Sequence, residues 1–306
     1  MPLCRSDSVT SMERHIPKVI VIIPSYNREK YIRTTIDSTL SQTYGNIEVV
    51  VVDDGSTDRS REILESYGKR IRLLEHEERA NRGQSAAINL AMRSTGGEYV
   101  AILDSDDIWT VDKIEKQVDY LERHPDIGIV YGNGYAIDED GKILYKLIPP
   151  GHREENDPSR MLLECHFNIP SNALVRRSAF DRTGEFDETL RSSQDHDMAI
   201  RLLEVTKAAF LDEPVWYYRR HPDTQSTKHT KRRWVNGFII LDKACRRHPY
   251  AWSVRRRRLA VLHFRLAQCL ASEREYLPAV KNFLLSGIFD PARAVKVLLG
   301  TEKDKV

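Results

Sequence analysis

Short apolar runs and amphipathic segments alternate along the first half of the chain. The apolar runs are rich in β-branched residues and occupy positions 18–23, 47–52, 71–74 and 100–103. Runs of this length and composition are typical of strands that are buried on both faces. Between them, apolar residues recur every three or four positions, as in a predicted helix with Ile32, Ile36 and Leu40 on one face. This alternation predicts an α/β fold with a Rossmann-like, mostly parallel sheet flanked by helices.

The pattern changes character near residue 230. Before that point it predicts a helix over 113–123, strands over 127–131, 172–175 and 215–218, and a helix that opens at Asp195. Beyond it, helical spacing predicts a helix with Trp234 and Leu241 on one face, then helices over 254–270, 276–285 and 291–299. We therefore expect a flexible leader over 1–17, an α/β domain over 18–229 and a helical C-terminal extension over 230–306.

Two of the predicted strands end in clustered carboxylates. Asp53 and Asp54 follow the second strand, and Asp104, Asp106 and Asp107 follow the fourth. Parallel strands bring their carboxyl ends to one edge of the sheet, where open α/β folds bind ligands. Crowded carboxylates repel one another and resist desolvation, so we expect a cation there, and a divalent metal suits oxygen ligands. Taken alone, each cluster also fits an Asp-rich turn that caps a helix.

Composition narrows the class of protein. A hydrophobic content of 41% and a charged content of 30% fit a soluble globular chain. The net charge of +2 argues against binding nucleic acid with the chain as a whole. The 4 cysteines are scattered without the spacing of a zinc site or a disulfide framework, which favours a reduced, cytoplasmic setting. No apolar run approaches the ~18 residues needed to span a bilayer, so we expect any membrane contact to be peripheral.

Four segments occur in the order and approximate spacing of a known family. They are Ile23-Pro24-Ser25-Tyr26-Asn27, Val52-Asp53-Asp54-Gly55-Ser56, Leu103-Asp104-Ser105-Asp106-Asp107 and Gln194-Asp195-His196-Asp197. As a set, they resemble glycosyltransferase family 2, the inverting enzymes with the GT-A fold. The resemblance covers roughly residues 18–222, and the leader and the helical extension lie outside it.

The resemblance implies a donor site for a nucleotide sugar, with a UDP sugar favoured. The residues that it implies for nucleotide-sugar binding are Pro24, Ser25, Tyr26, Asp54, Asp104 and Ser105. Asp104-Ser105-Asp106 corresponds to the DxD element, in which Asp106 would bind Mn²⁺ or Mg²⁺ at the diphosphate. His221 is a further metal or diphosphate ligand in this interpretation, and a hydrogen-bonded loop histidine in the alternative one.

Asp195 corresponds to the aspartate of the family's ED element and would be the general base. It would take a proton from the acceptor hydroxyl as that oxygen attacks the anomeric carbon. This chain has Gln194 where Glu is common in the family, which keeps a hydrogen-bonding group and removes a charge. Asp197 lies two positions further along the predicted helix and would point elsewhere, so Asp195 is preferred.

The implied function is transfer of a sugar from a nucleoside-diphosphate sugar to a hydroxyl of a saccharide or lipid-linked acceptor, in surface polysaccharide or glycan synthesis. A nucleotidyltransferase is an alternative, but the loop after the first strand lacks the Gly-rich, basic phosphate-binding sequence. A catalytically inactive binding protein on a GT-A fold is another, and it would be expected to have lost Asp106 or Asp195.

Basic residues concentrate beyond the α/β domain, at 231–233, 246–247 and 255–258. On helices with apolar faces they predict a peripheral contact with anionic lipid, which would suit a lipid-linked acceptor. A partner-binding surface or a solvated helix face explains them equally well. Nucleic acid is not expected, because no recognition motif accompanies the charge.

Overall fold

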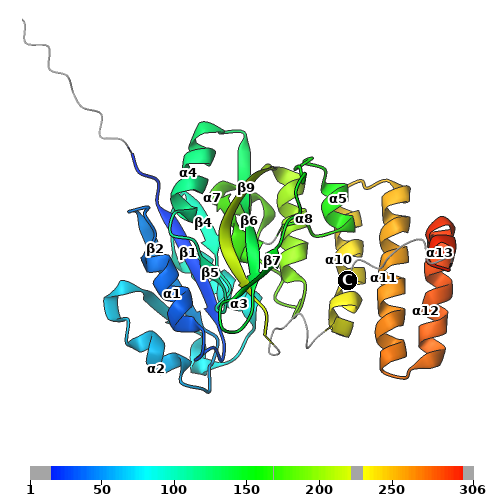
Figure 1. Ribbon diagram of the computed structural model, residues 1–306, viewed down its shortest axis with the longest axis horizontal. Helices are drawn as coiled ribbons and strands as arrows, with labels where there is room; N and C mark the ends of the chain where they lie inside the picture. The colour runs from blue at the N-terminus through cyan, green and yellow to red at the C-terminus, as the bar shows by residue number, and fades with distance from the viewer. Residues whose placement is uncertain (1–14, 168, 222–229, 299–306) are drawn as a thin grey trace, which may run out of the picture.

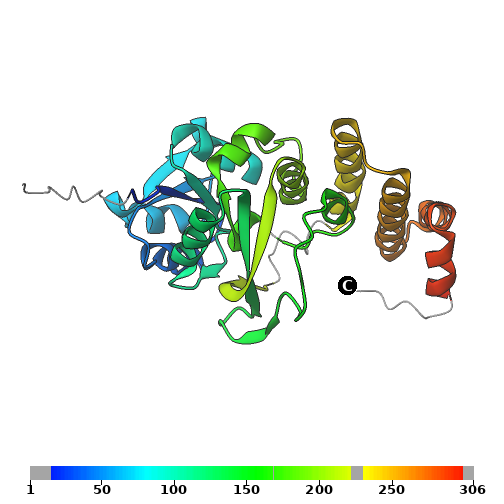
Figure 2. The ribbon, with the colours of Figure 1, turned by 90° about the horizontal axis from the view of Figure 1, so that it is seen from above.

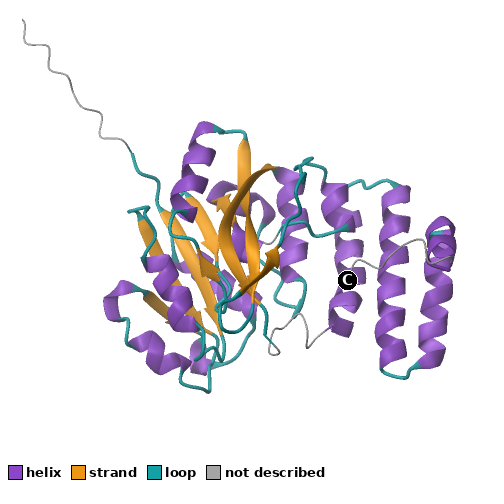
Figure 3. Cartoon of the chain, in the orientation of Figure 1, coloured by secondary structure: helices purple, strands orange, loops and turns teal. Residues whose placement is uncertain are grey.

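The computed structural model describes residues 15–167, 169–221 and 230–298. These residues form a single sheet of nine strands with helices on both faces (Figures 1 and 3). The strands are β1 (Val19–Ser25), β2 (Ile47–Asp53), β3 (Arg72–Glu75), β4 (Tyr99–Ile102), β5 (Ile108–Trp109), β6 (Ile127–Ile137), β7 (Ile143–Lys146), β8 (Ala173–Arg176) and β9 (Lys207–Arg219).

The helices of the α/β part are α1 (Ile32–Leu40), α2 (Ser60–Glu65), α3 (Gln84–Ser94), α4 (Lys113–Arg123), α5 (Pro158–Leu163), α6 (Ile169–Asn172), α7 (Arg177–Thr183) and α8 (Gln194–Val205). Four more follow near the C-terminus: α10 (Thr230–Arg247), α11 (Trp252–Ser272), α12 (Tyr276–Phe289) and α13 (Pro291–Leu298). The predicted helical character of this last part is therefore seen from Thr230 to Leu298.

The sheet has the strand order β3-β2-β1-β4-β8-β6-β9-β5, with β7 paired to β6. The first four strands are mutually parallel, as the alternating pattern predicted. β8 lies antiparallel between β4 and β6, and β6 is parallel to β9. β4 and β6 consequently run in the same direction, so the carboxyl ends of β1, β2, β4, β6 and β9 face one edge.

Strand residues alternate between two apolar cores. Ile20 and Ile22 of β1 pack with residues of α3, α7 and α8 on one face of the sheet. Val19 and Val21 pack with residues of α1, α2 and α4 on the other face. All seven residues of β1 are buried, which is the reason for its continuous apolar sequence. Figure 2 shows the two helical layers on either side of the sheet.

Several boundaries differ from those the sequence predicts. β1 continues past Pro24 to Ser25, because its pairing with β4 has already ended at Ile22 and the missing N–H is tolerated there. β9 begins at Lys207 instead of residue 215, and register shifts opposite Pro214 absorb the polar interruption in its sequence. β5, α5 and α7 are short elements that were not predicted.

The chain on either side of the α/β part also contacts it. Most of the expected leader lies outside the described residues, but Pro17 O accepts a hydrogen bond from Tyr44 Oη at 2.6 Å. At the other end, Ile240, Leu241 and Ala244 of α10 belong to the same apolar core as α8. Of the helices described between residues 15 and 298, none is long and apolar enough to cross a membrane.

Candidate functional site

The turn that follows β4 holds three of the carboxylates that the sequence singled out. Asp104 and Asp106 are half-buried there, and Ser105 between them is buried. Oδ2 of Asp106 accepts a hydrogen bond from Arg28 Nε at 3.1 Å and lies 3.0 Å from His221 Nε2. The fold thus brings Asp106 and His221, which are 115 positions apart in the sequence, into direct contact.

The two half-buried carboxylates differ in their electrostatic surroundings. Burial, together with the charges of Asp106 and Asp195, raises the pKa of Asp104 to about 7. Burial alone would also raise the pKa of Asp106, but the hydrogen bond with His221 and the charge of Arg28 hold that pKa below its ordinary value. Of the two, Asp106 therefore keeps its negative charge more readily, because Arg28 and His221 lie beside it.

A chain of side-chain amides connects Asp104 to the helix of Asp195. Gln84 Nε2 donates to Asp104 Oδ1 at 2.6 Å, and Gln84 Oε1 accepts from Gln194 Nε2 at 2.5 Å. A glutamate at position 194 has no N–H to offer Gln84 Oε1. The amide at position 194 is thus matched to the orientation that Gln84 takes when it donates to Asp104.

Asp195 is the second residue of α8 and is half-buried. The chain enters α8 through Ser193, which has a left-handed φ of 60°. Burial raises the pKa of Asp195, against the opposing effects of the His196 N–H and the charge of Arg233. A raised pKa makes the carboxylate a stronger base than an exposed aspartate, which suits proton abstraction near neutral pH.

Asp197 has a structural environment instead. Its side chain is fully buried, with Arg201 Nη2 at 2.9 Å and Lys243 Nζ of α10 at 3.4 Å. These ion pairs connect α8 to the first helix of the C-terminal part. Asp197 thus has a structural environment, and the role of Asp195 as the residue that faces a ligand stays a prediction.

We expect Asp197→Ala to lower the free energy of unfolding by about 3–5 kcal/mol, since it leaves the buried Arg201 without its carboxylate. Chemical denaturation of the purified variant measures this loss. Asp181→Ala is the matched control, because Asp181 is 66% exposed and its ion pair with Arg177 is long, at 3.9 Å. Exposed ion pairs of this kind contribute little to stability. Equal stability of the two variants would contradict a structural role for Asp197.

A buried serine supports the turn after β4 from the far side. Ser171 Oγ donates to Asp107 Oδ2 at 2.6 Å and accepts from Asp104 N at 3.3 Å. Arg219 N donates to the other oxygen of Asp107 at 3.0 Å. Ser171 has a φ of 76°, an unfavourable backbone conformation for a residue with a Cβ. Asp107 therefore fixes the turn that presents Asp104 and Asp106, and it is not itself presented to a ligand.

The end of β2 lies beside the end of β1 at the same edge. Asp54 N donates to Ser25 O at 2.8 Å. The Asp54 carboxylate accepts from the backbone N–H groups of Arg82 and Gly83, each at 2.8 Å. Pro24, Ser25, Tyr26 and Asp54 are thus gathered at this edge, with Tyr26 39% exposed. In this structure Asp54 holds the loop before α3, and a contact with a nucleotide base remains a prediction.

The sequence reasoning did not single out Arg28, Gln84 or Ser171 as site residues. Arg28 had a recognisable signal, since a cation follows the first strand and faces a predicted cluster of acids. For Gln84, the sequence indicated only a position at the start of a helix. For Ser171, the sequence indicated no role in the site, because its left-handed backbone conformation is imposed by the contacts around it.

The described residues do not contain a group of three or more His, Cys, Asp or Glu side chains arranged to hold a metal ion. The donor set nevertheless fits a cation that completes its shell with substrate oxygens. Asp106 and His221 are in contact, and the charge of Asp106 raises the pKa of the neighbouring Asp104. Mg²⁺ in particular is held by one or two carboxylates together with phosphate oxygens instead of by a full protein cage.

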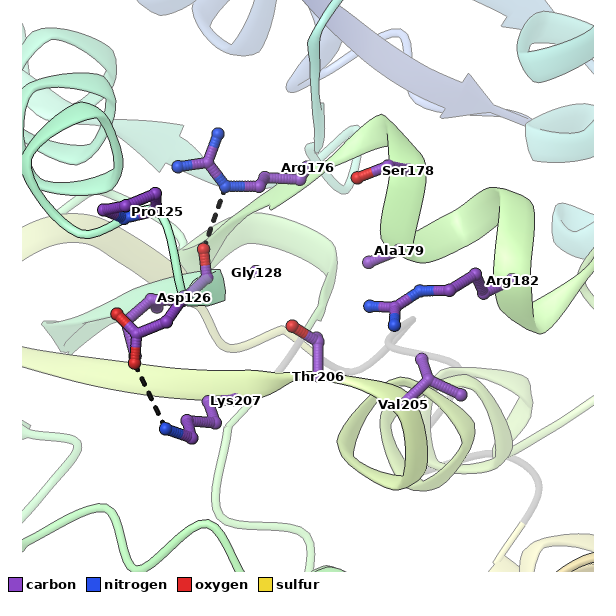
Figure 4. A pocket seen from close by; sticks show the side chains of 11 residues that line it. Pro125, Asp126, Gly128, Arg176, Ser178, Ala179, Arg182, Val205, Thr206 and Lys207 are labelled. Carbon is purple, nitrogen blue, oxygen red and sulfur yellow. Dashed lines mark hydrogen bonds and ion pairs between the residues drawn. The ribbon is translucent and has the colours of Figure 1, made fainter.

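A separate hollow of about 320 Å³ lies at the opposite edge of the sheet (Figure 4). It is lined by residues where β6 and β9 begin, among them Ile127 and Lys207, and by Arg176 and Arg182. Asp126 and Lys207 form an ion pair across part of it at 3.1 Å. None of the predicted site residues lines this hollow, so it is distinct from the carboxylate edge.

Comparison with known proteins identifies the family. Residues 20–184 match the profile of Glycosyl transferase family 2. The chain belongs to glycosyltransferase family 2. The matched segment contains all of β1 except Val19, together with β2, β4 and the Asp104–Asp106 turn, and it ends before Asp195. The resemblance inferred from the sequence is therefore confirmed at the level of family.

Curated relatives give the same assignment over part of their own length. An uncharacterized glycosyltransferase of Rickettsia typhi is 35% identical over 214 residues, which are 69% of this chain and 66% of the relative. A chondroitin synthase of Escherichia coli is 29% identical over 238 residues, which are 76% of this chain and 33% of that protein. This glycosyltransferase family 2 chain thus spans less than two thirds of the length of these relatives.

Solved structures establish the fold. The structure of S. aureus TarS 1-349 in complex with UDP-GlcNAc has a TM-score of 0.68 at 20% identity, and covers 88% of this chain and 81% of that one. The mannosyltransferase PcManGT from Pyrobaculum calidifontis, in complex with GDP-Man and Mn²⁺, has a TM-score of 0.62 at 22% identity, with 94% and 89% covered. The predicted GT-A fold of this family 2 chain is thereby confirmed.

Proposed function

We propose that this chain is an inverting, metal-dependent glycosyltransferase that moves a sugar from a nucleoside-diphosphate sugar, with UDP favoured, to a hydroxyl of a saccharide or lipid-linked acceptor. The observation that carries the proposal is the convergence of Asp195 with Asp104 and Asp106. Gln84 connects Asp104 to Gln194, the neighbour of Asp195, and the charges of Asp106 and Asp195 both raise the pKa of Asp104, although α8 lies far along the chain from β4. The complexes of TarS with UDP-GlcNAc and of PcManGT with GDP-Man support the class of donor.

In this proposal the acceptor hydroxyl binds beside Asp195. The Asp195 carboxylate takes the proton of that hydroxyl as its oxygen attacks the anomeric carbon from the face opposite the diphosphate, so the configuration inverts. A single base is sufficient, because the leaving diphosphate needs charge stabilisation more than a proton. The arrangement differs in this respect from a glycosidase, which requires two carboxylates at the anomeric carbon.

The remaining site residues hold the donor. Asp106 and His221 would hold Mn²⁺ or Mg²⁺, which offsets the negative charge that develops on the departing diphosphate. Asp104 and Ser105 would orient the ribose side of the nucleotide. Pro24, Ser25, Tyr26 and Asp54 would receive the base, with Asp54 accepting an N–H of uracil. The Gln84–Gln194 pair would keep Asp104 and the start of α8 at a fixed separation.

A thermal-shift screen of nucleotide sugars, each with and without Mn²⁺, tests the proposal. A donor that binds only the folded protein raises the melting temperature by mass action. We expect at least one UDP sugar to stabilise the chain in the presence of Mn²⁺ and to lose most of that effect with a chelator. If no nucleotide sugar raises the melting temperature, either with Mn²⁺ or without it, the proposed donor class is wrong.

A further inference from the structure

The last long helix of the described chain exposes a continuous apolar face. Six apolar side chains of α12 are between 40% and 87% exposed: Tyr276, Leu277, Val280, Phe283, Leu284 and Ile288. They recur every three or four positions, so they share one side of the helix. A surface of this kind is unusual on a protein that is surrounded only by water.

The side of α12 that faces α11 is mixed in character, since Phe289 stacks on His263 and Phe283 packs edge-on against Phe264. Asn282 Oδ1 lies 2.8 Å from His263 Nδ1 of α11, and Ser286 Oγ donates to Ala260 O at 2.8 Å. Ala279 on the same side is buried. An ordinary surface helix turns a polar side to water, whereas the outer side of α12 is apolar as well. Figures 1 and 2 place it beyond α11, at the end of the molecule farthest from β1 to β3.

The charge of this end of the molecule is strongly positive. Residues 252–298 include nine Lys or Arg and three Asp or Glu. Two of the three acids, Glu273 and Glu275, each accept from Lys231 Nζ at 2.6 Å, and the single positive charge of Lys231 offsets one of them. Not every cation is at the surface, because Arg258 is 7% exposed and donates to Leu163 O. Lys281, however, is exposed beside the apolar face itself.

Charge decides which partner this face suits. A two-fold contact with a second copy would set one basic surface against the same basic surface, at a cost in repulsion. An anionic bilayer surface offers apolar acyl chains for the exposed face and negative headgroups for the cations around it. At ~1.5 Å per residue, the 14 residues of α12 are too short to cross the hydrocarbon core, but they can lie in its interface.

We propose that α12 is an in-plane membrane anchor that docks the apolar face formed by Tyr276, Leu277, Val280, Phe283, Leu284 and Ile288 on anionic lipid. The proposal does not depend on the assigned chemistry, because it rests on exposure, polarity and charge outside the carboxylate edge. The basic runs predicted a peripheral membrane contact, and the proposal assigns that contact to one helix. Insertion of apolar side chains is then the main source of binding, and charge adds to it.

Co-sedimentation with lipid vesicles tests the anchor. The full chain is mixed with vesicles of phosphatidylcholine alone and with vesicles of equimolar phosphatidylcholine and phosphatidylglycerol. We expect sedimentation with the anionic vesicles, weakened by high salt. The double variant Leu277→Gln/Leu284→Gln should bind roughly tenfold or more weakly, because burial of one leucine side chain alone is worth about that factor.

Ile143→Gln/Leu144→Gln is the matched control, since these β7 side chains are also about half exposed, at 52% and 47%, but lie outside the helical end. It should bind vesicles as the parent chain does. Undiminished binding by the α12 variant, or no binding of the parent chain to anionic vesicles, would overturn the proposal. The proposal would also be overturned if the parent chain does not bind vesicles but forms a dimer in sedimentation equilibrium, and the α12 variant does not form that dimer. The thermal shift with donor, measured without lipid, reports on the proposed function separately.

Discussion

Replacing Asp195 by Asn is expected to lower kcat by about 10²- to 10⁴-fold, the usual contribution of a positioned general base. The amide has nearly the same shape as the carboxylate but cannot accept the proton of the acceptor hydroxyl. Donor affinity should be unchanged, because the proposed contacts with the nucleotide come from the ends of β1, β2 and β4. Steady-state kinetics with the donor found by thermal shift, combined with calorimetry of nucleotide binding, separate these two effects.

The pH profile sharpens this first test. Burial raises the pKa of Asp195, and a base is inactive once it is protonated. As the pH is lowered, the activity of the parent enzyme should therefore begin to fall at a higher pH than it would with an exposed aspartate as the base. The residual rate of the Asp195→Asn variant should not show this fall. Asp181→Asn on the exposed side of α7 serves as the control. Near-normal turnover of Asp195→Asn would mean that another group is the base.

The second large effect concerns Asp106. We expect Asp106→Ala to abolish the gain in nucleotide affinity that Mn²⁺ provides, and to lower kcat/KM by roughly 100-fold or more, since a metal supplies several kcal/mol of charge stabilisation. The substitution also leaves Arg28 and His221 without the carboxylate that they share. Isothermal titration of the nucleoside diphosphate, with Mn²⁺ and with a chelator, measures the change.

Asp126→Ala is a suitable control for this experiment, because Asp126 pairs with Lys207 at the opposite edge of the sheet. That variant should retain the dependence on Mn²⁺. If the parent chain binds the nucleotide equally well with and without metal, or if Asp106→Ala still responds to Mn²⁺, the assignment of Asp106 as a metal ligand is wrong. The titration reports on binding alone, so it does not depend on identifying the acceptor.

Arg28 is expected to affect how tightly Asp106 binds a metal ion. In this structure the guanidinium of Arg28 meets the same carboxylate oxygen as His221 does. A divalent cation at Asp106 therefore has to share or displace a positive group that is already present. Part of the energy of binding the metal is used in that exchange, so the affinity for the metal alone should be lower than the affinity in the presence of a diphosphate, which adds negative charge.

The local sequence determined the parallel half of the sheet and the edge at which the clustered carboxylates lie. Buried strands need continuous apolar residues, and such a run cannot end in Asp53-Asp54 or in Asp104 to Asp107 without a reason that concerns the strand ends. Periodicity also predicted the helices from Thr230 onward, because one side of each must pack. These signals are short-range, so they are readable along the chain.

Only the tertiary structure decided which side chains meet. The contacts of Asp106 with Arg28 and His221, and the Gln84 link between Asp104 and Gln194, join segments brought together by crossovers of the sheet, and no pattern within one segment encodes them. The same holds for Asp197, whose buried carboxylate forms an ion pair with Lys243 of α10, and for the outward apolar face of α12. Periodicity shows that a helix has an apolar side, but the direction in which that side points depends on the neighbour against which its other side packs.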